Sequence, residues 1–494
     1  MKKLNNFIEK YRFMLLFFIV SSILIHLALF TKDILTADVL LNANYYDGYS
    51  WEISLGRFGL YIFGLLKGFM VFKDLEIFLS IILFGISSGL LLDLFNIKNK
   101  VVQTLSLLVI SSSPIVSATL LFHYCALPYS FAFLCGVLSI YLLANSQNKI
   151  IKYLLPIFLI CTSLSLYQAY LAVPVTLIAL YSIKRIFDNK FIWKDLLIPL
   201  LITLLGTIFY FILMKISLLI FQVDMSSYRG ANSFSLSTML DIPKRIIDCY
   251  LSFYQYYFSD KIVNNGNLSI NIYNIFFLGI GLISIILSAI KNKLSWKYNL
   301  LLTFLIICLP LCVNVISIIL PDTSLQLLMS SGYLLFIIFF GYLISDNKIL
   351  TILGCIILIL IARGYLIQDQ ATYQTLDNTY RKTYEVANDI KDEMIETNCR
   401  QLMIVGNLQE NNLDIRSLTY GFVSNYPLFW EEYSNLKNGW ERFMKYYVGY
   451  SISFVDQKKY DAILKGSKFK KMKSYPNDES IQLIDDVLVI KIAN

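Results

Sequence analysis

Acidic, basic and aromatic residues crowd together in one short stretch of this 494-residue sequence. The stretch Leu40–Leu66 reads LLNANYYDGYSWEISLGRFGLYIFGLL and sets Asp47 among tyrosines and Trp51. A carboxylate can take a proton from an attacking hydroxyl, and the guanidinium of Arg57 can hold phosphate oxygens in a bidentate fork. The rings of Tyr46 and Trp51 can stack on the apolar faces of sugars. The stretch therefore indicates a base, a sugar platform and a phosphate clamp, or alternatively an interfacial aromatic belt with solvated charges.

The chain around this stretch is strongly apolar. Hydrophobic residues make up 57% of it and charged residues 15%, whereas soluble domains average roughly 45–50% apolar and about 25% charged. Apolar runs recur that are long enough to cross about 30 Å of hydrocarbon. We therefore expect an all-α polytopic membrane protein with about eleven transmembrane helices. The expected spans are 13–30, 75–95, 101–121, 127–144, 151–167, 169–183, 196–221, 270–290, 299–320, 325–344 and 349–367.

The charge pattern predicts which ends of these spans face the cytoplasm. Loops on one side, such as Asn96–Lys100 (NIKNK) and Ser345–Lys348 (SDNK), all carry Lys or Arg, and the short loops on the other side carry none. Because Lys and Arg collect in cytoplasmic loops, we expect the N-terminus inside a bacterial cytoplasmic membrane and the C-terminus outside. The formal net charge of +8 then reflects orientation and gives no reason to expect a nucleic-acid partner.

This orientation requires that Trp51–Phe72 does not cross the membrane. The segment is apolar, but four glycines interrupt it and Arg57 and Lys67 lie within it. We interpret it as a helix lying at the outer membrane face. The alternative is a twelfth span, which would invert every later loop.

Two domains are expected. Residues 1–369 form the transmembrane part, with large outer loops at 31–74 and 222–269. Residues 370–494 form a small α/β domain outside the membrane, with a helical stretch at Ala371–Asn398 and β-type runs at Gln401–Val405 and Asp486–Ile492. No internal repeat is visible, which disfavours a paired-repeat transporter.

Several short motifs resemble one family. The first outer loop, with YYDGYSWEISLGRFG, is similar to the first periplasmic loop of the bacterial glucosyltransferase II family, membrane enzymes that change serotype by decorating O-antigen and related surface glycans. The segments LSLYQAYLAV (Leu164–Val173) and SYRGAN (Ser227–Asn232) and the tail start QATY (Gln370–Tyr373) extend the resemblance over nearly the whole chain. Family members often carry two adjacent acidic residues in this loop, whereas Gly48 follows Asp47 here. Glu52 or Asp33 would have to replace the second carboxylate.

The resemblance implies a GT-C type fold and a glucosyltransferase whose donor is glucose on a polyprenyl phosphate. The implied companions are a polyprenyl-phosphate glucose synthase and a flippase that turns the loaded donor outward. The acceptor would be a surface polysaccharide such as O-antigen. Asp47 is then the expected base, and Arg57 and Arg229 the residues that stabilise the leaving phosphate. The full set of expected substrate-binding residues is Tyr46, Trp51, Glu52, Arg57, Tyr167, Gln168, Tyr228, Arg229 and Arg363.

Arg363 enters this set because an ionisable residue within a span is costly and is often functional; Lys215 has a similar position, and snorkelling to the headgroups is the alternative for both. No cofactor is expected: two His and eight mostly intramembrane Cys form no metal motif, although a divalent ion stays open, and no Gly-rich phosphate loop occurs. The rival functions are a transporter or flippase for lipid-linked glycans, a polysaccharide polymerase or ligase, and a non-catalytic glycan-binding protein.

Overall fold

The computed structural model describes residues 2–42, 44–46, 48–228, 241–258, 268–320, 326–406, 419–420 and 433–492. The chain divides into two compact units. The first contains Met1–Leu27 and Asn44–Asp369, and the second contains Ala28–Ala43 and Gln370–Asn494. The expected outer loop 31–74 is therefore shared between them, because its first part packs with the C-terminal residues.

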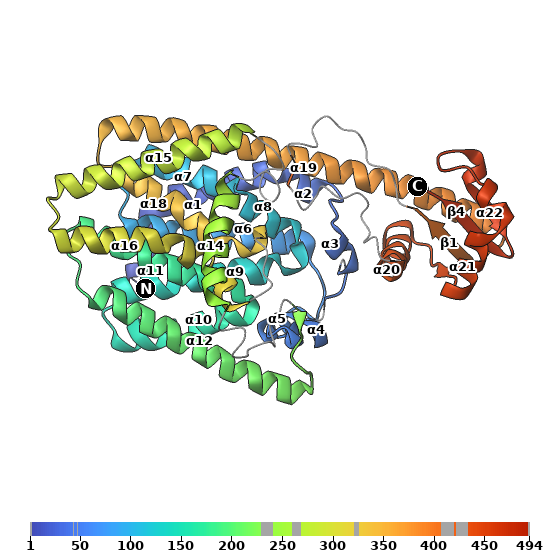
Figure 1. The fold of residues 1–494 in the computed structure, drawn as a ribbon, viewed down its shortest axis with the longest axis horizontal. Helices are drawn as coiled ribbons and strands as arrows, with labels where there is room; N and C mark the ends of the chain where they lie inside the picture. The colour runs from blue at the N-terminus through green and yellow to red at the C-terminus, as the bar shows by residue number, and fades with distance from the viewer. Residues whose placement is uncertain are drawn as a thin grey trace. The chain divides into compact units, whose positions relative to one another are not determined.

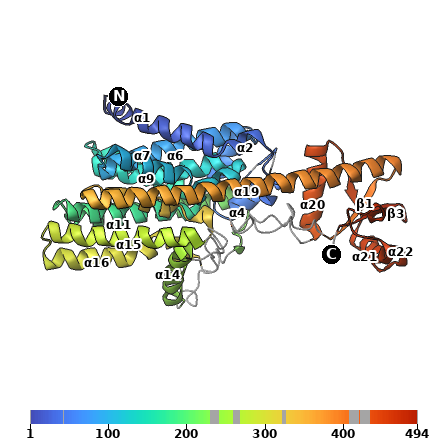
Figure 2. The ribbon, with the colours of Figure 1, turned by 90° about the horizontal axis from the view of Figure 1, so that it is seen from above.

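Helices build the first unit (Figure 1). The long ones run largely parallel or antiparallel, and α14 runs across the direction of α15 and α16 in both side views (Figures 1 and 2). The helices are α1 (Lys2–Ile25), α4 (Ser50–Ser54), α5 (Phe58–Leu66), α6 (Lys73–Phe95), α7 (Lys100–Ser111), α8 (Pro114–Leu121), α9 (His123–Asn145), α10 (Leu155–Leu166), α11 (Ala172–Phe187), α12 (Lys194–Phe221), α14 (Ile242–Phe258), α15 (Leu268–Lys291), α16 (Trp296–Val313), α17 (Val315–Ile319) and α18 (Leu334–Ile344). Two further helices, α2 (Leu27–Thr31) and α19 (Lys348–Glu396), contain residues of both units.

Within the described residues, seven helices are long and apolar enough to cross a membrane, or eight if the bent pair α7–α8 counts as one span. The expected count of eleven is therefore not confirmed. Two of the expected spans correspond to apolar helices that are shorter than this criterion, Ile150–Leu166 and Ser331–Ile344. The 42° bend between α7 and α8 has a local cause, because Ser113 caps α8 and Pro114 occupies its first turn.

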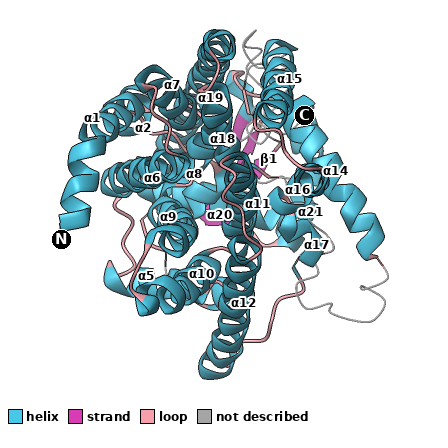
Figure 3. Ribbon diagram, turned by 90° about the vertical axis from the view of Figure 1, so that its left-hand side faces the viewer, coloured by secondary structure: helices cyan, strands magenta, loops and turns pink. Residues whose placement is uncertain are grey.

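Inside the bundle, neighbouring helices pack in a row. α6 packs on α9, α9 on α10 and α10 on α12, as the view along the bundle shows (Figure 3). Where α10 and α12 meet, Gly206 lies so close to Ile160 that a Cβ on the glycine would come within 2.8 Å of that side chain. Such small residues let membrane helices approach closely.

The sequence predicts a single helix over Trp51–Phe72, whereas the structure has two short helices there. α4 has five residues and α5 has nine. At about 1.5 Å per residue, neither approaches the roughly 30 Å of a hydrocarbon core. Two of the four glycines in this stretch, Gly56 and Gly68, follow the ends of these helices, and the other two lie within α5.

The second unit contains a four-stranded sheet of order β2-β1-β4-β3. β1 is parallel to β2 and β4, and β3 is antiparallel to β4. Two strands coincide with the expected β-type runs, and the helix expected at 371–398 is the end of α19. The other elements were not expected. The elements are α3 (Ala37–Leu41), β1 (Gln401–Val405), α20 (Tyr433–Phe443), β2 (Ser453–Phe454), α21 (Gln457–Lys465), α22 (Ser467–Lys471), β3 (Ile481–Ile484) and β4 (Val487–Lys491).

Candidate active site

The first outer loop is shaped by the way α4 ends. Gly56 follows the last residue of α4 with a φ of +80°, a conformation that costs glycine little. The Gly56 N–H donates to the Ile53 carbonyl, and the Arg57 N–H donates to the Glu52 carbonyl, both at 2.8 Å. These two bonds form a Schellman cap. The cap folds the backbone of Arg57 back over the last turn of α4, next to Glu52.

This turn brings Arg57 into an ion pair with Glu52, and Tyr46 binds the other carboxylate oxygen of Glu52. Arg57 Nη1 donates to Glu52 Oε2 at 3.1 Å, and the Tyr46 hydroxyl donates to Glu52 Oε1 at 2.7 Å. All three side chains are largely buried. Both carboxylate oxygens of Glu52 thus have a donor, so the role that fits Glu52 is to orient Arg57 rather than to accept a proton from a substrate.

The guanidinium of Arg57 is held on a second side by aromatic rings. It lies 4.5 Å from the centre of the Tyr167 ring, and Tyr167 stacks on Tyr129 at 4.8 Å. Such cation–π contacts strengthen when they are desolvated. Arg57 Nε is buried and has no hydrogen-bond partner among the described residues. The side chain therefore keeps donor capacity after its protein contacts are made.

The electrostatics of this group follow from burial and the Glu52 charge. Burial lowers the pKa of Arg57, but Glu52 and the neighbouring Tyr129, Tyr167 and Tyr46 together outweigh burial, so the pKa of the guanidinium is raised above its usual value. Burial, and then the Glu52 charge, raise the pKa of Tyr46 well above its usual value. Arg57 thus stays cationic and Tyr46 stays a hydrogen-bond donor over the physiological pH range.

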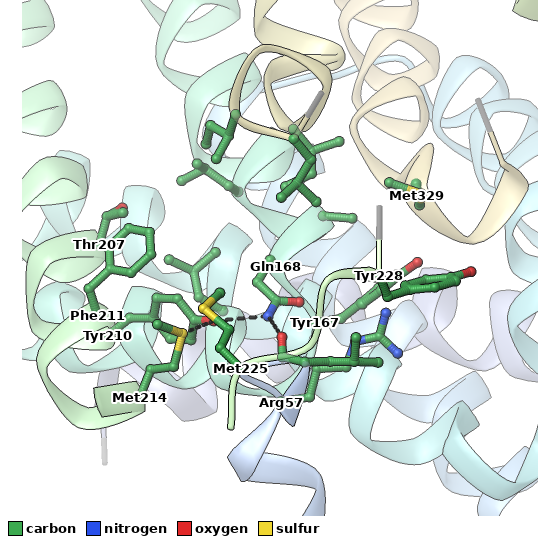
Figure 4. A pocket seen from close by; sticks show the side chains of 17 residues that line it. Arg57, Tyr167, Gln168, Thr207, Tyr210, Phe211, Met214, Met225, Tyr228 and Met329 are labelled. Atoms are coloured by element: carbon green, nitrogen blue, oxygen red, sulfur yellow. Dashed lines mark hydrogen bonds between the residues drawn. The ribbon is translucent and has the colours of Figure 1, made fainter. Parts of the chain in front are cut away.

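Arg57 lines a pocket of the first unit (Figure 4). The pocket encloses about 840 Å³, part of it open to solvent. Arg57 is its single charged lining residue within the described part of the chain. The remaining lining residues are apolar or uncharged: Leu55, Leu164, Tyr167, Gln168, Ala169, Leu171, Thr207, Tyr210, Phe211, Met214, Met225, Tyr228, Ile316, Ile319, Leu320 and Met329.

The wall of the pocket is tied to the Arg57 turn by hydrogen bonds. Gln168 Nε2 donates to the Leu55 carbonyl at 2.5 Å and to the Tyr210 hydroxyl at 2.9 Å. The Tyr210 hydroxyl in turn donates to the Gly56 carbonyl at 3.1 Å. Figure 4 shows Gln168 between Tyr210 on one side and Arg57 on the other. Residues from two distant helical segments thereby meet at one turn of the loop.

An aromatic pair stands beside the guanidinium. Tyr228 lines the pocket, and its ring lies 5.7 Å from that of Trp51, centre to centre. Both side chains are substantially exposed, at 44% and 56%. The Ser226 N–H donates to the Ser54 carbonyl at 2.9 Å, so the start of the second outer loop is anchored on α4. Two loops far apart in sequence together present exposed rings close to Arg57.

A second buried ion pair lies at the other end of α5. Gly68 and Phe69 close that helix with another Schellman cap, in which their N–H groups donate to Leu65 and Gly64. Lys67 Nζ donates to Glu76 Oε1 at 2.6 Å and to the Tyr124 carbonyl at 3.3 Å. Neither Lys67 nor Glu76 lines the pocket. This pair joins the end of α5 to α6.

The structure brings most of the expected site residues together and leaves two undescribed. Tyr46, Trp51, Glu52, Arg57, Tyr167, Gln168 and Tyr228 form one cluster. Asp47, the expected base, and Arg229 lie outside the described residues. The chain neighbours of Asp47 are fixed, because Tyr45 makes a β-bridge to Met70 and Gly48, at a φ of +56°, packs against the backbone of α5.

Three other residues considered from the sequence do not line the pocket. Arg363 on α19 and Lys215 on α12 are exposed and do not line the pocket. Asp33, the alternative carboxylate, belongs to the second unit, where it is hydrogen-bonded to Tyr380. Burial, and then the charge of Asp33, raise the pKa of Tyr380 to about 12.

Sequence reasoning missed Tyr210 and the apolar wall that α12 and α17 supply. A hydroxyl inside the apolar run of α12 was the available signal for Tyr210, since a polar group there needs a partner. No comparable signal marked the apolar lining residues, because in the sequence they cannot be told from lipid-facing or core residues.

Among the described residues, no group of three or more His, Cys, Asp and Glu side chains is placed to hold a metal ion. Comparison with curated proteins and with solved structures gave no match. The family model described as Glucosyl transferase GtrII matches residues 27–339, a range that includes Arg57, Glu52 and every residue that lines the pocket. Since this match covers more than half of the sequence, the chain belongs to the glucosyl transferase GtrII family.

Proposed function

We propose that this glucosyltransferase moves glucose from a polyprenyl-phosphate carrier to a cell-surface polysaccharide such as O-antigen. The observation that carries the proposal is the position of Arg57, which is a buried, permanently charged donor in a pocket wall whose other described residues are uncharged. A lipid-linked sugar phosphate has the matching chemistry, with one anionic group between a sugar and a hydrocarbon tail. The apolar lining from α12 and α17 suits the first part of the tail.

In the proposed reaction the acceptor hydroxyl attacks the anomeric carbon of the donor glucose. The new C–O bond forms as the bond between the anomeric carbon and the phosphate oxygen breaks, and polyprenyl phosphate leaves with that electron pair. Asp47 takes the proton of the acceptor hydroxyl. Arg57 stabilises the negative charge that develops on the leaving phosphate, as preorganised donors do in a water-poor site. Arg229, directly after Tyr228 in sequence, is the second cation proposed for this role.

The exposed pair Trp51 and Tyr228 is the proposed platform for a sugar ring. Aromatic side chains supply rigid contact area at low entropic cost. Tyr228 lies beside Arg57 in the pocket (Figure 4), and the Trp51 ring contacts Tyr228. Glu52 and Tyr46 support this arrangement indirectly, because they hold Arg57 in place.

We place the reaction at the outer face of the cytoplasmic membrane, with the N-terminus inside and the C-terminal unit outside. The Lys and Arg distribution in the loops supports this orientation. The donor would then be made in the cytoplasm by a polyprenyl-phosphate glucose synthase and delivered by a flippase. Both companions are parts of the proposal.

The test is a comparison of wild type and Asp47→Asn in a host that lacks the gene, at equal membrane abundance. Mass spectrometry of the surface polysaccharide should show an added hexose with the wild type and almost none with the variant. The same pair is then assayed in detergent with polyprenyl-phosphate glucose as donor. A hexose added equally by both proteins would remove Asp47 from the mechanism. Turnover by the wild type of nucleotide-linked glucose alone would exclude the lipid-linked donor.

A further inference from the structure

We propose that Gln168 and Tyr210 are positioning residues that set the orientation in which Arg57 meets the donor phosphate. The inference rests on the proposed function and assigns a role to a tyrosine within the apolar helix α12. It concerns side chains that act through Arg57 rather than on the substrate.

The first observation is where their hydrogen bonds end. Gln168 Nε2 binds the carbonyl of Leu55, and the Tyr210 hydroxyl binds the carbonyl of Gly56. These are the two residues directly before Arg57, and the Gly56 carbonyl belongs to the peptide bond that leads into it. The Tyr210 hydroxyl also accepts from Gln168, so both side chains act as one unit. Each side chain therefore donates one hydrogen bond to the backbone that carries the guanidinium.

The second observation is how tightly the turn is packed. Tyr210 is buried, at 2% exposure, and its ring stacks on Phe58 at 6.0 Å, so it contacts the residues on both sides of Arg57. A Cβ on Gly56 would approach the Tyr210 hydroxyl to 2.6 Å and Met214 Sδ to 2.8 Å. The turn therefore has no room to rotate toward α12.

The third observation argues against the alternative that these hydrogen bonds only stabilise the contact between α12 and the loop. Glu52 and Tyr167 hold the tip of the Arg57 side chain, whereas Gln168 and Tyr210 hold the backbone at its root. A side chain fixed at both ends points in one direction. Small displacements of a charged donor cost catalysis steeply, so loss of the root contacts should affect phosphate stabilisation before it affects folding.

The experiment uses purified full-length protein with polyprenyl-phosphate glucose as donor and polyprenyl phosphate as product inhibitor. Tyr210→Phe removes only the hydroxyl, and we expect kcat to fall about tenfold, within the range of coupling between contacting residues. Inhibition by polyprenyl phosphate should weaken by a similar factor, while the KM for the acceptor stays unchanged. Tyr250→Phe is the matched control, because it also removes a hydroxyl-to-carbonyl bond between helices, from Tyr250 to Ile307 at 2.7 Å, away from the pocket.

A double-mutant cycle separates positioning from packing. If Tyr210 acts through Arg57, Tyr210→Phe should cause no further loss in an Arg57→Lys protein. Gln168→Met should behave like Tyr210→Phe, and the two together should cost no more than one. The positioning role would be overturned if the losses of activity from the single variants multiplied in the combined variants. It would also be overturned if Tyr250→Phe lowered kcat as much as Tyr210→Phe.

The outcomes also separate this inference from the proposed function. Wild type that neither uses the lipid-linked donor nor is inhibited by polyprenyl phosphate would overturn the proposed function itself. Wild type that does both, with Tyr210→Phe and Gln168→Met unaffected, would overturn only the positioning role. Thermal unfolding of each variant in detergent identifies a folding defect. If either Tyr210→Phe or Gln168→Met has such a defect, the other variant tests the positioning role.

Discussion

The two ends of the short helices α4 and α5 are built alike and serve different purposes. Each ends in a Schellman cap with a glycine at positive φ, Gly56 and Gly68, and each has a buried ion pair beside it. Arg57 faces a pocket and keeps a nitrogen that has no partner among the described residues. Lys67 binds Glu76 and a backbone carbonyl and does not line the pocket that Arg57 lines. The same local motif thus presents a cation to a pocket at one end and joins the loop to α6 at the other.

The largest effect should come from Arg57. Arg57→Lys keeps the charge but loses the planar fork, and we expect activity to fall by about 100-fold or more, as for loss of one preorganised donor. The measurement is kcat/KM with the lipid-linked donor, alongside the thermal midpoint, which should change little. Arg185→Lys is the matched control, because Arg185 also pairs with a carboxylate, Asp195 at 3.1 Å, outside the pocket. Equal losses in both variants would contradict a specific role of Arg57 in the reaction.

A smaller loss is expected when the partner of Arg57 is neutralised. Glu52→Gln preserves the shape of the side chain but removes the charge that holds the guanidinium, and activity should fall about tenfold to thirtyfold, less than for loss of a general base. The pH profile of kcat should keep its shape, because Glu52 orients Arg57 and does not transfer a proton. A profile that loses its acidic limb in the variant would make Glu52 the base instead.

The two cap glycines offer a matched pair. Alanine at either position is strained by positive φ to a similar degree, about 1 kcal/mol. Only at Gly56 would the new methyl group also meet Tyr210 and Met214, since nothing lies within 4 Å of the corresponding position at Gly68. We expect Gly56→Ala to lose about tenfold in activity and Gly68→Ala to retain it. Similar activities for both would show that the turn tolerates movement.

The smallest effect on chemistry should come from the second ion pair. Lys67→Met leaves Glu76, at 2% exposure, without its cation, and breaking a buried pair costs about 3–5 kcal/mol of stability. The thermal midpoint in detergent should therefore fall while activity per folded molecule stays the same. The double variant Lys67→Met/Glu76→Met should recover most of the midpoint. Loss of activity in that well-folded double variant would place the Lys67 end in the reaction.

The local sequence pattern was sufficient to predict some of the helices and strands and insufficient to predict others. The four glycines of Trp51–Phe72 indicated an irregular stretch, but only the structure shows that Gly56 and Gly68 end two separate helices with Schellman caps, while the other two glycines lie within α5. The strand at Gln401–Val405 was predictable from its β-branched and apolar residues. Two expected spans correspond to apolar helices that are shorter than the seven long ones, because apolar composition does not fix where a helix begins and ends.

The sequence by itself determined the apolar helical class, the family, and the concentration of Asp47, Glu52, Arg57 and aromatic residues in one loop. It did so because hydropathy and residue type are local properties. Only the tertiary structure decided which groups meet: that Glu52 is occupied by Tyr46 and Arg57, that Tyr210 reaches Gly56 from 154 residues away, and that residues 28–43 pack with the C-terminal unit. Such contacts depend on how helices pack in space, and no spacing along the chain encodes them.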